Sequence, residues 1–218
     1  MTQRRPLAGA GALAPMIGLL LMLSAFASSA RTVEGRVDLV AGPRQEVAAG
    51  EVSEGVVYVL PKAAFTPPRP ATFRVDTNSK GFAPATLVVP VGSRVQFPNS
   101  DVILHNVFSR TPGSTFDTGF YPGGQVREHT FTRPGLVIVN CSVHHMMRAT
   151  VIVLGTPFYA RPGRDGRFRI EGVPEGEATI VYWHPRAAPA SVPLGERTTG
   201  LGQRMVATKP RNTQGAGR

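Results

Sequence analysis

The chain has 218 residues, a formal net charge of +10 and one cysteine. A single cysteine excludes an internal disulfide, a multi-cysteine zinc site and a cysteine-held iron–sulfur cluster. A hydrophobic fraction of 42% excludes a disordered chain, and the 24 glycines and 20 prolines indicate short strands joined by many turns.

Residues 1–30 have the features of a secretory signal peptide. Arg4 and Arg5 precede a short apolar run, and small residues lead to Ala30, where we expect cleavage. The alternative is an uncleaved membrane anchor, which the shortness of the run and Pro15 near its start disfavour. The two adjacent arginines also suggest export by the twin-arginine pathway, although the rest of the motif for that pathway is weak. We therefore expect a periplasmic protein with no stable membrane insertion after cleavage.

Short apolar stretches, bounded by Gly, Pro, Asn or Asp, recur between residues 31 and 195, and helical periodicity is hard to find there. Several stretches are continuous rather than alternating, which is typical of strands in the core of a sandwich. The sequence therefore predicts an all-β fold, with β-sandwiches favoured and a proline-rich connector at 61–70. The stretches lie at 56–60, 86–89, 94–97, 136–139, 150–154, 168–170 and 179–182.

Residue types that bind soft metals follow one of these stretches. Cys141, His144 and Met147 stand at positions i, i+3 and i+6. A cysteine at a strand end, followed by a tight loop, can direct a thiolate, an imidazole and a thioether at one point. His105, at another transition from strand to loop, supplies the second imidazole. Two imidazoles, a thiolate and a distant thioether are the ligands of a blue-copper electron-transfer site.

Each of these residues also has an ordinary structural explanation. A lone cysteine, for example, is usually a small buried hydrophobic residue. The coincidence of Cys141, His144 and Met147 within seven residues favours copper. An unpaired thiol in an exported protein favours it too, since metal ligation protects the thiol. His145 and Met146 remain alternatives to His144 and Met147. The two other histidines lack nearby partner ligands and are not expected to bind metal.

Residues 71–155 resemble the cupredoxins, most closely the amicyanin- and plastocyanin-like members. Many chains of this kind are labelled methylamine utilization proteins. The motifs that carry the resemblance are Cys141-x-x-His144-x-x-Met147, His105-Asn106-Val107, residues 82–99 and Phe131-Thr132-Arg133-Pro134-Gly135. The resemblance implies a Greek-key β-sandwich that holds one copper ion, Cu(I) or Cu(II). His105, Cys141 and His144 would be its equatorial ligands and Met147 its axial ligand.

The resemblance also implies a place for a redox partner protein, which would dock near His144. Val143, Met146 and Phe108 are the candidates for an apolar patch there. Asn106 would hold the ligand loop beside the cysteine through hydrogen bonds.

These residues predict an electron carrier and not an enzyme. No His-x-His sequence accompanies the cysteine, so no oxygen-reducing copper cluster is encoded. One alternative is periplasmic copper binding, buffering or delivery, with His145 and Met146 as extra soft ligands. Another is a structural, adhesion-like β protein with a vestigial site. Nucleic acid is not an expected partner, because the chain lacks an aromatic–basic stripe.

Residues 164–185 resemble the second half of carboxypeptidase regulatory-like modules, which are small transthyretin-like β-sandwiches. A matching first half is missing just before them but is present near 33–37 and 55–60. We therefore expect the cupredoxin-like segment to be inserted into, or packed beside, a discontinuous sandwich of residues 31–62 and 156–195. The alternative is one extended sandwich with extra strands at both ends. No catalytic residues of a peptidase accompany the module.

Residues 196–218 form a basic tail. It has five basic residues and no acid after Glu196. Because its apolar content is low, we expect it to be disordered and to touch an anionic surface or an acidic partner.

Overall fold

The structure is a computed structural model that describes residues 30–196 and 198–210. The predicted signal peptide up to residue 29 and the last part of the predicted tail, residues 211–218, lie outside the described residues. Strands and the turns between them make up nearly all of the described chain, with one short 3-10 helix, η1 (Glu51–Glu54). The all-β prediction is therefore confirmed.

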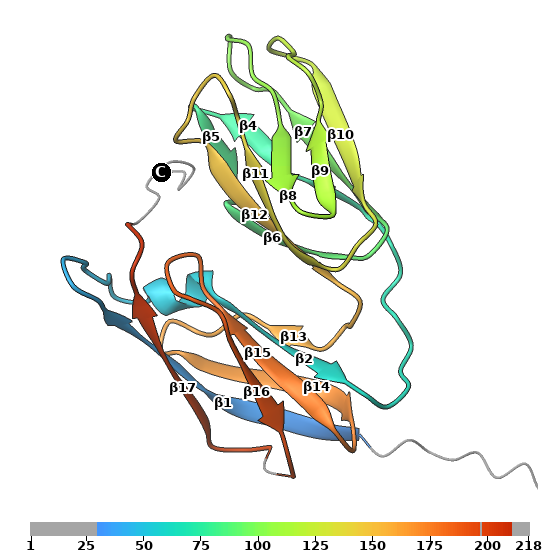
Figure 1. The fold of residues 1–218 in the computed structure, drawn as a ribbon, viewed down its shortest axis with the longest axis vertical. Coiled ribbons are helices and arrows are strands. Elements are labelled where there is room, and N and C mark those ends of the chain that lie inside the picture. The colour runs from blue at the N-terminus through green and yellow to red at the C-terminus, as the bar shows by residue number, and fades with distance from the viewer. Residues whose placement is uncertain (1–29, 197, 211–218) are drawn as a thin grey trace, which may run out of the picture.

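The central part of the chain forms one sandwich, in the upper half of Figure 1. Its strands are β3 (Thr72–Arg74), β4 (Asp76–Asn78), β5 (Gly81–Ala83), β6 (Thr86–Pro90), β7 (Ser93–Pro98), β8 (Phe108–Thr111), β9 (Ser114–Asp117), β10 (Val126–Phe131), β11 (Gly135–Asn140) and β12 (Arg148–Leu154). One sheet has the order β10-β7-β3, the other has the order β6-β12-β11-β8-β9, and β4 pairs with β5. Alternate residues such as Phe97 in β7 and Val137 and Val151 in β11 and β12 form the buried core.

Strands from both ends of the chain form a second sandwich, in the lower half of Figure 1. They are β1 (Ala30–Ala41), β2 (Val56–Pro61), β13 (Tyr159–Ala160), β14 (Arg167–Pro174), β15 (Ala178–Trp183), β16 (Ala190–Leu194) and β17 (Leu201–Ala207). The two sheets have the orders β14-β1-β17 and β13-β2-β15-β16, and their core includes Val33, Ile170, Val59 and Ile180.

The strand pairing joins segments that lie far apart in the sequence. β1 runs antiparallel to β14, with Val33 opposite Ile170. β2 runs antiparallel to β15, with Val59 opposite Ile180. Within the described residues, β3 to β12 pair only among themselves. The central sandwich therefore lies between β2 and β13 in chain order. The assignment of the outer sandwich to a carboxypeptidase regulatory-like module stays a prediction.

The predicted disorder of residues 196–218 is wrong for β17. This strand runs parallel to β1, from Gly35 opposite Leu201 to Ala41 opposite Ala207. Burial alternates along the end of this strand, so that Met205 and Ala207 are buried whereas Val206 between them is 40% exposed. Low total apolar content concealed this strand, because a strand needs only every second residue to be apolar. The outer sandwich thus extends beyond residue 195.

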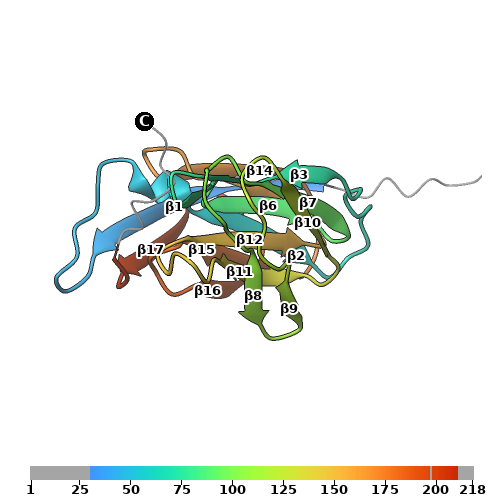
Figure 2. The same cartoon turned by 90° about the horizontal axis from the view of Figure 1, so that it is seen from above.

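A small apolar cluster joins the two sandwiches. Ile152 and Leu154 in β12 pack with Val56 in β2 and Trp183 in β15, and all four are buried. In Figure 2, seen from above, the strands of one sandwich lie over those of the other. The contact on the side of the central sandwich is therefore made by the sheet that contains β6, β11 and β12.

Candidate metal centre

Two loops at one end of the central sandwich bring the predicted ligands together. The first loop joins β7 to β8 and contains His105, and the second joins β11 to β12 and contains Cys141. Phe108 at the start of β8 pairs with Asn140 at the end of β11. This pairing places the two loops side by side at the same end of the sheet.

The structure places His105, Cys141 and His144 around one point. Their ligand atoms all lie within 4.8 Å of one another. The His105 Nδ1 atom is 3.6 Å from the Cys141 Sγ atom, and the centroids of the two imidazole rings are 5.0 Å apart. Cys141 is a free thiol, and both it and His105 are buried, whereas His144 is half-buried.

Solvent exposure distinguishes the neighbouring candidate ligands of this loop, His144 from His145 and Met147 from Met146. Met147 is 0% exposed and belongs to the same buried cluster as Cys141, whereas Met146 is 65% exposed. His145 is exposed, and its neighbour His144 is half-buried. Two backbone bonds close the loop: Met147 N–H donates to the His144 carbonyl at 2.9 Å, and Cys141 N–H donates to the Met147 carbonyl at 3.3 Å.

His144 has an unsatisfied nitrogen that faces the interior. Its Nδ1 atom is buried and has no hydrogen-bond partner among the described residues. A buried polar atom without a partner costs about 1–3 kcal/mol, a cost that a bound metal ion would remove. A thiolate suits Cu(I), and imidazoles suit copper in both oxidation states. The donor set and this unpaired nitrogen therefore fit a copper ion.

The charge state of His144 also suits ligation. Desolvation lowers the pKa of His144 below 6.5, His105 and Lys80 lower it further, and Asp101 acts in the opposite direction. The ring is therefore neutral at pH 7 and keeps a lone pair for a metal.

Hydrogen bonds from neighbouring residues hold both loops in place. The Asn106 Oδ1 atom accepts bonds from the Ser142 backbone N–H at 2.8 Å and from the Ser142 hydroxyl at 2.9 Å. These are bonds of the kind predicted for Asn106. His105 exchanges two backbone hydrogen bonds with Tyr121, at 2.8 and 3.2 Å. The His105 Nε2 atom lies 2.9 Å from the Asp101 Oδ2 atom, within hydrogen-bond distance.

Sequence reasoning missed Asp101 and Tyr121. Asp101 lies four residues before His105, but in an irregular loop that spacing predicts no contact. Tyr121 reaches His105 only because the chain returns after β9, and no short-range pattern signals such a return. The only signal for Asp101 was a carboxylate near a predicted ligand histidine, since ligating histidines commonly bond a carboxylate through the other nitrogen.

A second group of residue types that bind metals lies in the outer sandwich, at Glu51, Glu54 and His184. Both nitrogens of His184 are already used. Its Nε2–H donates to the Glu51 carbonyl at 3.1 Å, and its Nδ1 atom accepts the Arg186 backbone N–H at 3.2 Å. The Glu51 carboxylate is ion-paired with the buried Arg186 guanidinium. This group is therefore a hydrogen-bonded and ion-paired network inside the outer sandwich.

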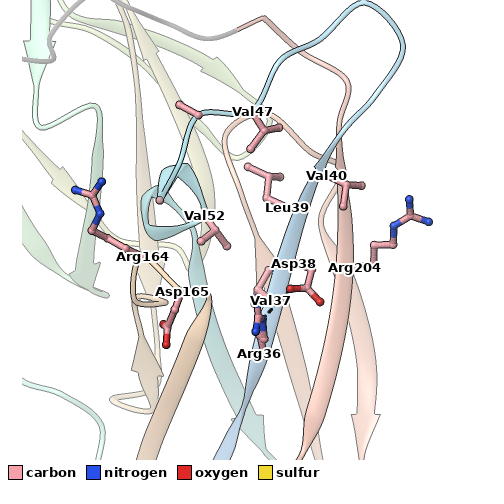
Figure 3. Close-up of a pocket in the computed structure, with 12 residues that line it drawn as sticks. Arg36, Val37, Asp38, Leu39, Val40, Val47, Val52, Arg164, Asp165 and Arg204 are labelled. Atoms are coloured by element: carbon pink, nitrogen blue, oxygen red, sulfur yellow. Dashed lines mark hydrogen bonds and ion pairs between the residues drawn. The ribbon is translucent and has the colours of Figure 1, made fainter.

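The outer sandwich also contains a pocket of about 430 Å³, shown in Figure 3. Aliphatic side chains, among them Leu39 and Val52, occupy its middle, and Arg164 and Arg204 extend to opposite sides. Its Arg36 is engaged by Asp38 at 2.9 Å. Binding sites for small molecules have a few convergent polar groups. The polar groups of this pocket diverge, so it is a weaker candidate than the Cys141 site.

Comparisons with known proteins match only part of the chain. No family model matches the sequence, and no curated protein matches it. A point mutant of amicyanin with Cu(I) is 26% identical with a TM-score of 0.36, and the match covers 38% of this chain and 82% of that one. A reduced point mutant of amicyanin is 27% identical with a TM-score of 0.35, covering 37% and 80%.

A purple cupredoxin from Nitrosopumilus maritimus is 26% identical with a TM-score of 0.33, and the match covers 37% of this chain and 98% of that one. All three TM-scores lie below 0.5, and each match covers little more than a third of this chain. The nature of the metal centre is therefore decided by its own residues, which form a two-histidine, one-cysteine cluster with a buried methionine beside it.

Proposed function

We propose that this chain is an exported copper protein that carries single electrons between partner proteins and is not an enzyme. The observation that carries the proposal is the cluster of His105, Cys141 and His144 ligand atoms within 4.8 Å, with an unpaired buried nitrogen on His144. These three residues would hold the ion, with Met147 as a fourth, weaker ligand. Copper, when bound, supplies a one-electron change between Cu(I) and Cu(II).

The protein's part in this function is to keep the ligands in one arrangement. Cys141 and His105 are buried, and hydrogen bonds to Asn106, Tyr121 and Asp101 hold the loops that carry them. Ligands that are held rigidly move little when the charge at their centre changes, so little energy is spent on rearrangement. A rigid, buried site suits electron transfer better than it suits metal exchange.

A partner protein would approach over the exposed end of the ligand loop. His144 is half-buried, and Val143 and Met146 in the same loop are 44% and 65% exposed. Phe108, the third predicted member of the apolar patch, is half-buried. Apolar contact at this place would exclude water and bring a partner's redox centre close to the half-buried imidazole.

Export to the periplasm is part of the proposal and rests on the sequence of residues 1–30. No helix among the residues that the structure describes has the length and apolar character needed to cross a membrane. The mature N-terminus, determined by mass spectrometry of protein purified from cells, tests the predicted cleavage after Ala30.

Copper buffering or delivery is the second candidate. It is favoured by His145 and Met146, which are exposed donors next to the buried cluster and accessible to a second protein. A delivery site must release its ion, so it would exchange Cu(I) readily and would lack a stable Cu(II) form.

Titration of the purified protein with Cu(II) separates these functions. An electron carrier is expected to bind one equivalent, to develop an intense blue or green absorption band, and to be reduced and reoxidised reversibly. Cys141→Ser is the control, because it removes the thiolate whose charge transfer gives the colour. A colourless, readily exchanged Cu(I) site would support delivery instead. Absence of stoichiometric copper binding would leave a structural β protein.

A further inference from the structure

The strongest feature that the proposed function leaves unexplained is the surroundings of Asp101. Its side chain is 14% exposed and lies in the loop between β7 and β8, four residues before His105. Its carboxylate has three hydrogen-bond partners. The Ser79 backbone N–H donates to Oδ1 at 2.7 Å, the Lys80 backbone N–H donates to Oδ2 at 2.9 Å, and the His105 Nε2 atom lies 2.9 Å from Oδ2.

The two backbone donors come from an unusual turn. Ser79 and Lys80 connect β4 to β5 and have φ angles of 53° and 56°, which place two consecutive non-glycine residues in the left-handed region. Such turns favour Asn and Gly, because other side chains are strained there. Strained residues persist where the surrounding structure holds them. Here the turn directs two adjacent N–H groups at one carboxylate, whose bonds offset the strain.

Further contacts fix the backbone of Asp101. Its N–H donates to Asn99 Oδ1 at 3.0 Å, and the Asn99 side-chain amide donates to the Ile103 carbonyl at 2.8 Å. Gly123 lies against the same residue so closely that a Cβ atom there would be 2.2 Å from the Asp101 carbonyl oxygen. Both the backbone and the carboxylate of Asp101 are therefore held in place.

We propose that Asp101 is a positioning residue, which makes the β4–β5 turn part of the metal centre by fixing the tautomer and ring angle of His105. An ionised carboxylate only accepts hydrogen bonds, so the His105 proton must lie on Nε2. Nδ1 is then left unprotonated, and it is this atom that lies 3.6 Å from the Cys141 Sγ atom. The proposal rests on the proposed copper function only for its effect on metal affinity.

An amide cannot replace this carboxylate. In Asp101→Asn, one oxygen would have to serve three donors that now share two oxygens. If that oxygen took the place of Oδ2, the new NH₂ group would face the Ser79 N–H, and two donors would oppose each other. If it took the place of Oδ1, the His105 proton would lose its acceptor. Either arrangement leaves His105 less firmly held.

The test that needs no metal is nitrogen-15 NMR of the imidazole rings in the copper-free protein at pH 7.5. In the unsubstituted protein, His105 is expected to show a single tautomer, protonated at Nε2. In Asp101→Asn it is expected to show a mixture of tautomers or exchange between them. An Nδ1-protonated His105 in the unsubstituted protein, or an unchanged pattern in the variant, would overturn the proposal whatever the copper results.

The second test measures copper affinity by competition with chelators. Asp101→Asn is expected to bind Cu(II) about 10–100-fold more weakly, as is usual when the hydrogen-bond acceptor of a ligating histidine is lost. The loss of the negative charge is expected to weaken the binding of Cu(II) more than the binding of Cu(I). Each tenfold difference between them raises the reduction potential by about 59 mV.

A control variant separates positioning from a general effect of charge. Asp76→Asn removes the same charge from the same sandwich, but Asp76 bonds Arg74 and not a ligand, so Cu(II) affinity should stay within about twofold. Equal losses in Asp101→Asn and Asp76→Asn would show a charge effect only and contradict the positioning role.

Discussion

Met146 and Met147 are neighbours with the same side chain, and burial is what separates their expected roles. Met147 is fully buried in the cluster that contains Cys141, and Met146 is 65% exposed. Met147→Leu should keep the absorption band, because the cysteine remains, but should raise the reduction potential by favouring Cu(I). A tenfold change in preference corresponds to about 59 mV, measurable by voltammetry. Met146→Leu is the matched control, and a shift in that variant alone would make Met146 the ligand.

His184 should make the stability of the outer sandwich depend on pH. Burial lowers its pKa below 6.5, against the raising effect of its bond to the Glu51 carbonyl and of the Glu54 and Glu51 charges, and with further lowering by Arg186. In the folded protein its Nδ1 atom accepts the Arg186 N–H, which a protonated ring cannot do. As the pH falls below 6.5, His184 is therefore protonated in the unfolded chain before it is protonated in the folded protein.

The free energy of unfolding should consequently fall between pH 7.5 and 5.5, by at most about 1.4 kcal/mol per pH unit from this residue. Urea unfolding at these two pH values measures it. His184→Gln should lose less stability on acidification than the unsubstituted protein. Identical pH dependence of the two proteins would assign the effect to other groups.

At the scale of elements, the pairing of β17 with β1 depends on the absence of a side chain at Gly35 in β1. A Cβ atom on Gly35 would lie 2.3 Å from the Leu201 carbonyl oxygen, so Gly35→Ala must push β17 away from β1. The expected loss is about 1–3 kcal/mol, seen as a lower melting temperature by circular dichroism. Gly202→Ala is the control, because Gly202 lies in β17 with nothing within 4 Å of such a Cβ. Equal effects of both substitutions would contradict the pairing of β17 with β1.

At the scale of the whole molecule, Trp183 reports on the contact between the two sandwiches. It is the only tryptophan in the chain, it is 7% exposed, and it packs with Ile152 and Leu154 of the central sandwich. Because this contact is apolar, we expect the two sandwiches to unfold together. In a denaturant titration of the copper-loaded protein, tryptophan emission and the visible absorption band should then change at the same midpoint.

Trp183→Phe keeps much of the apolar contact, whereas Trp183→Ala removes it. Trp183→Ala should lower the midpoint of the visible band, by an amount that corresponds to about 3–5 kcal/mol. Trp183→Phe should lower it less. An unchanged midpoint of the visible band in both variants would show that the sandwiches unfold independently.

The sequence alone was sufficient for the features that depend on neighbouring residues. Short apolar stretches between turn residues predicted the all-β fold, because local propensity and apolar pattern agree along most of the chain. The order Cys141, His144, Met147 is local in the same sense. Three residues per step along a tight loop allow the three side chains to converge, so this spacing, together with His105, predicted one metal site.

Tertiary structure decided what depends on residues that are far apart or on which side of a loop faces the core. The pairing of Leu201–Ala207 with β1 spans most of the chain, and its strand was hidden by low apolar content. Burial separated Met147 from Met146, which the sequence distinguished only through the resemblance to the cupredoxins. The carboxylate of Asp101 meets His105 only because the β4–β5 turn and Gly123 hold its loop. Local patterns determine which residues are available, and long-range packing determines which of them meet.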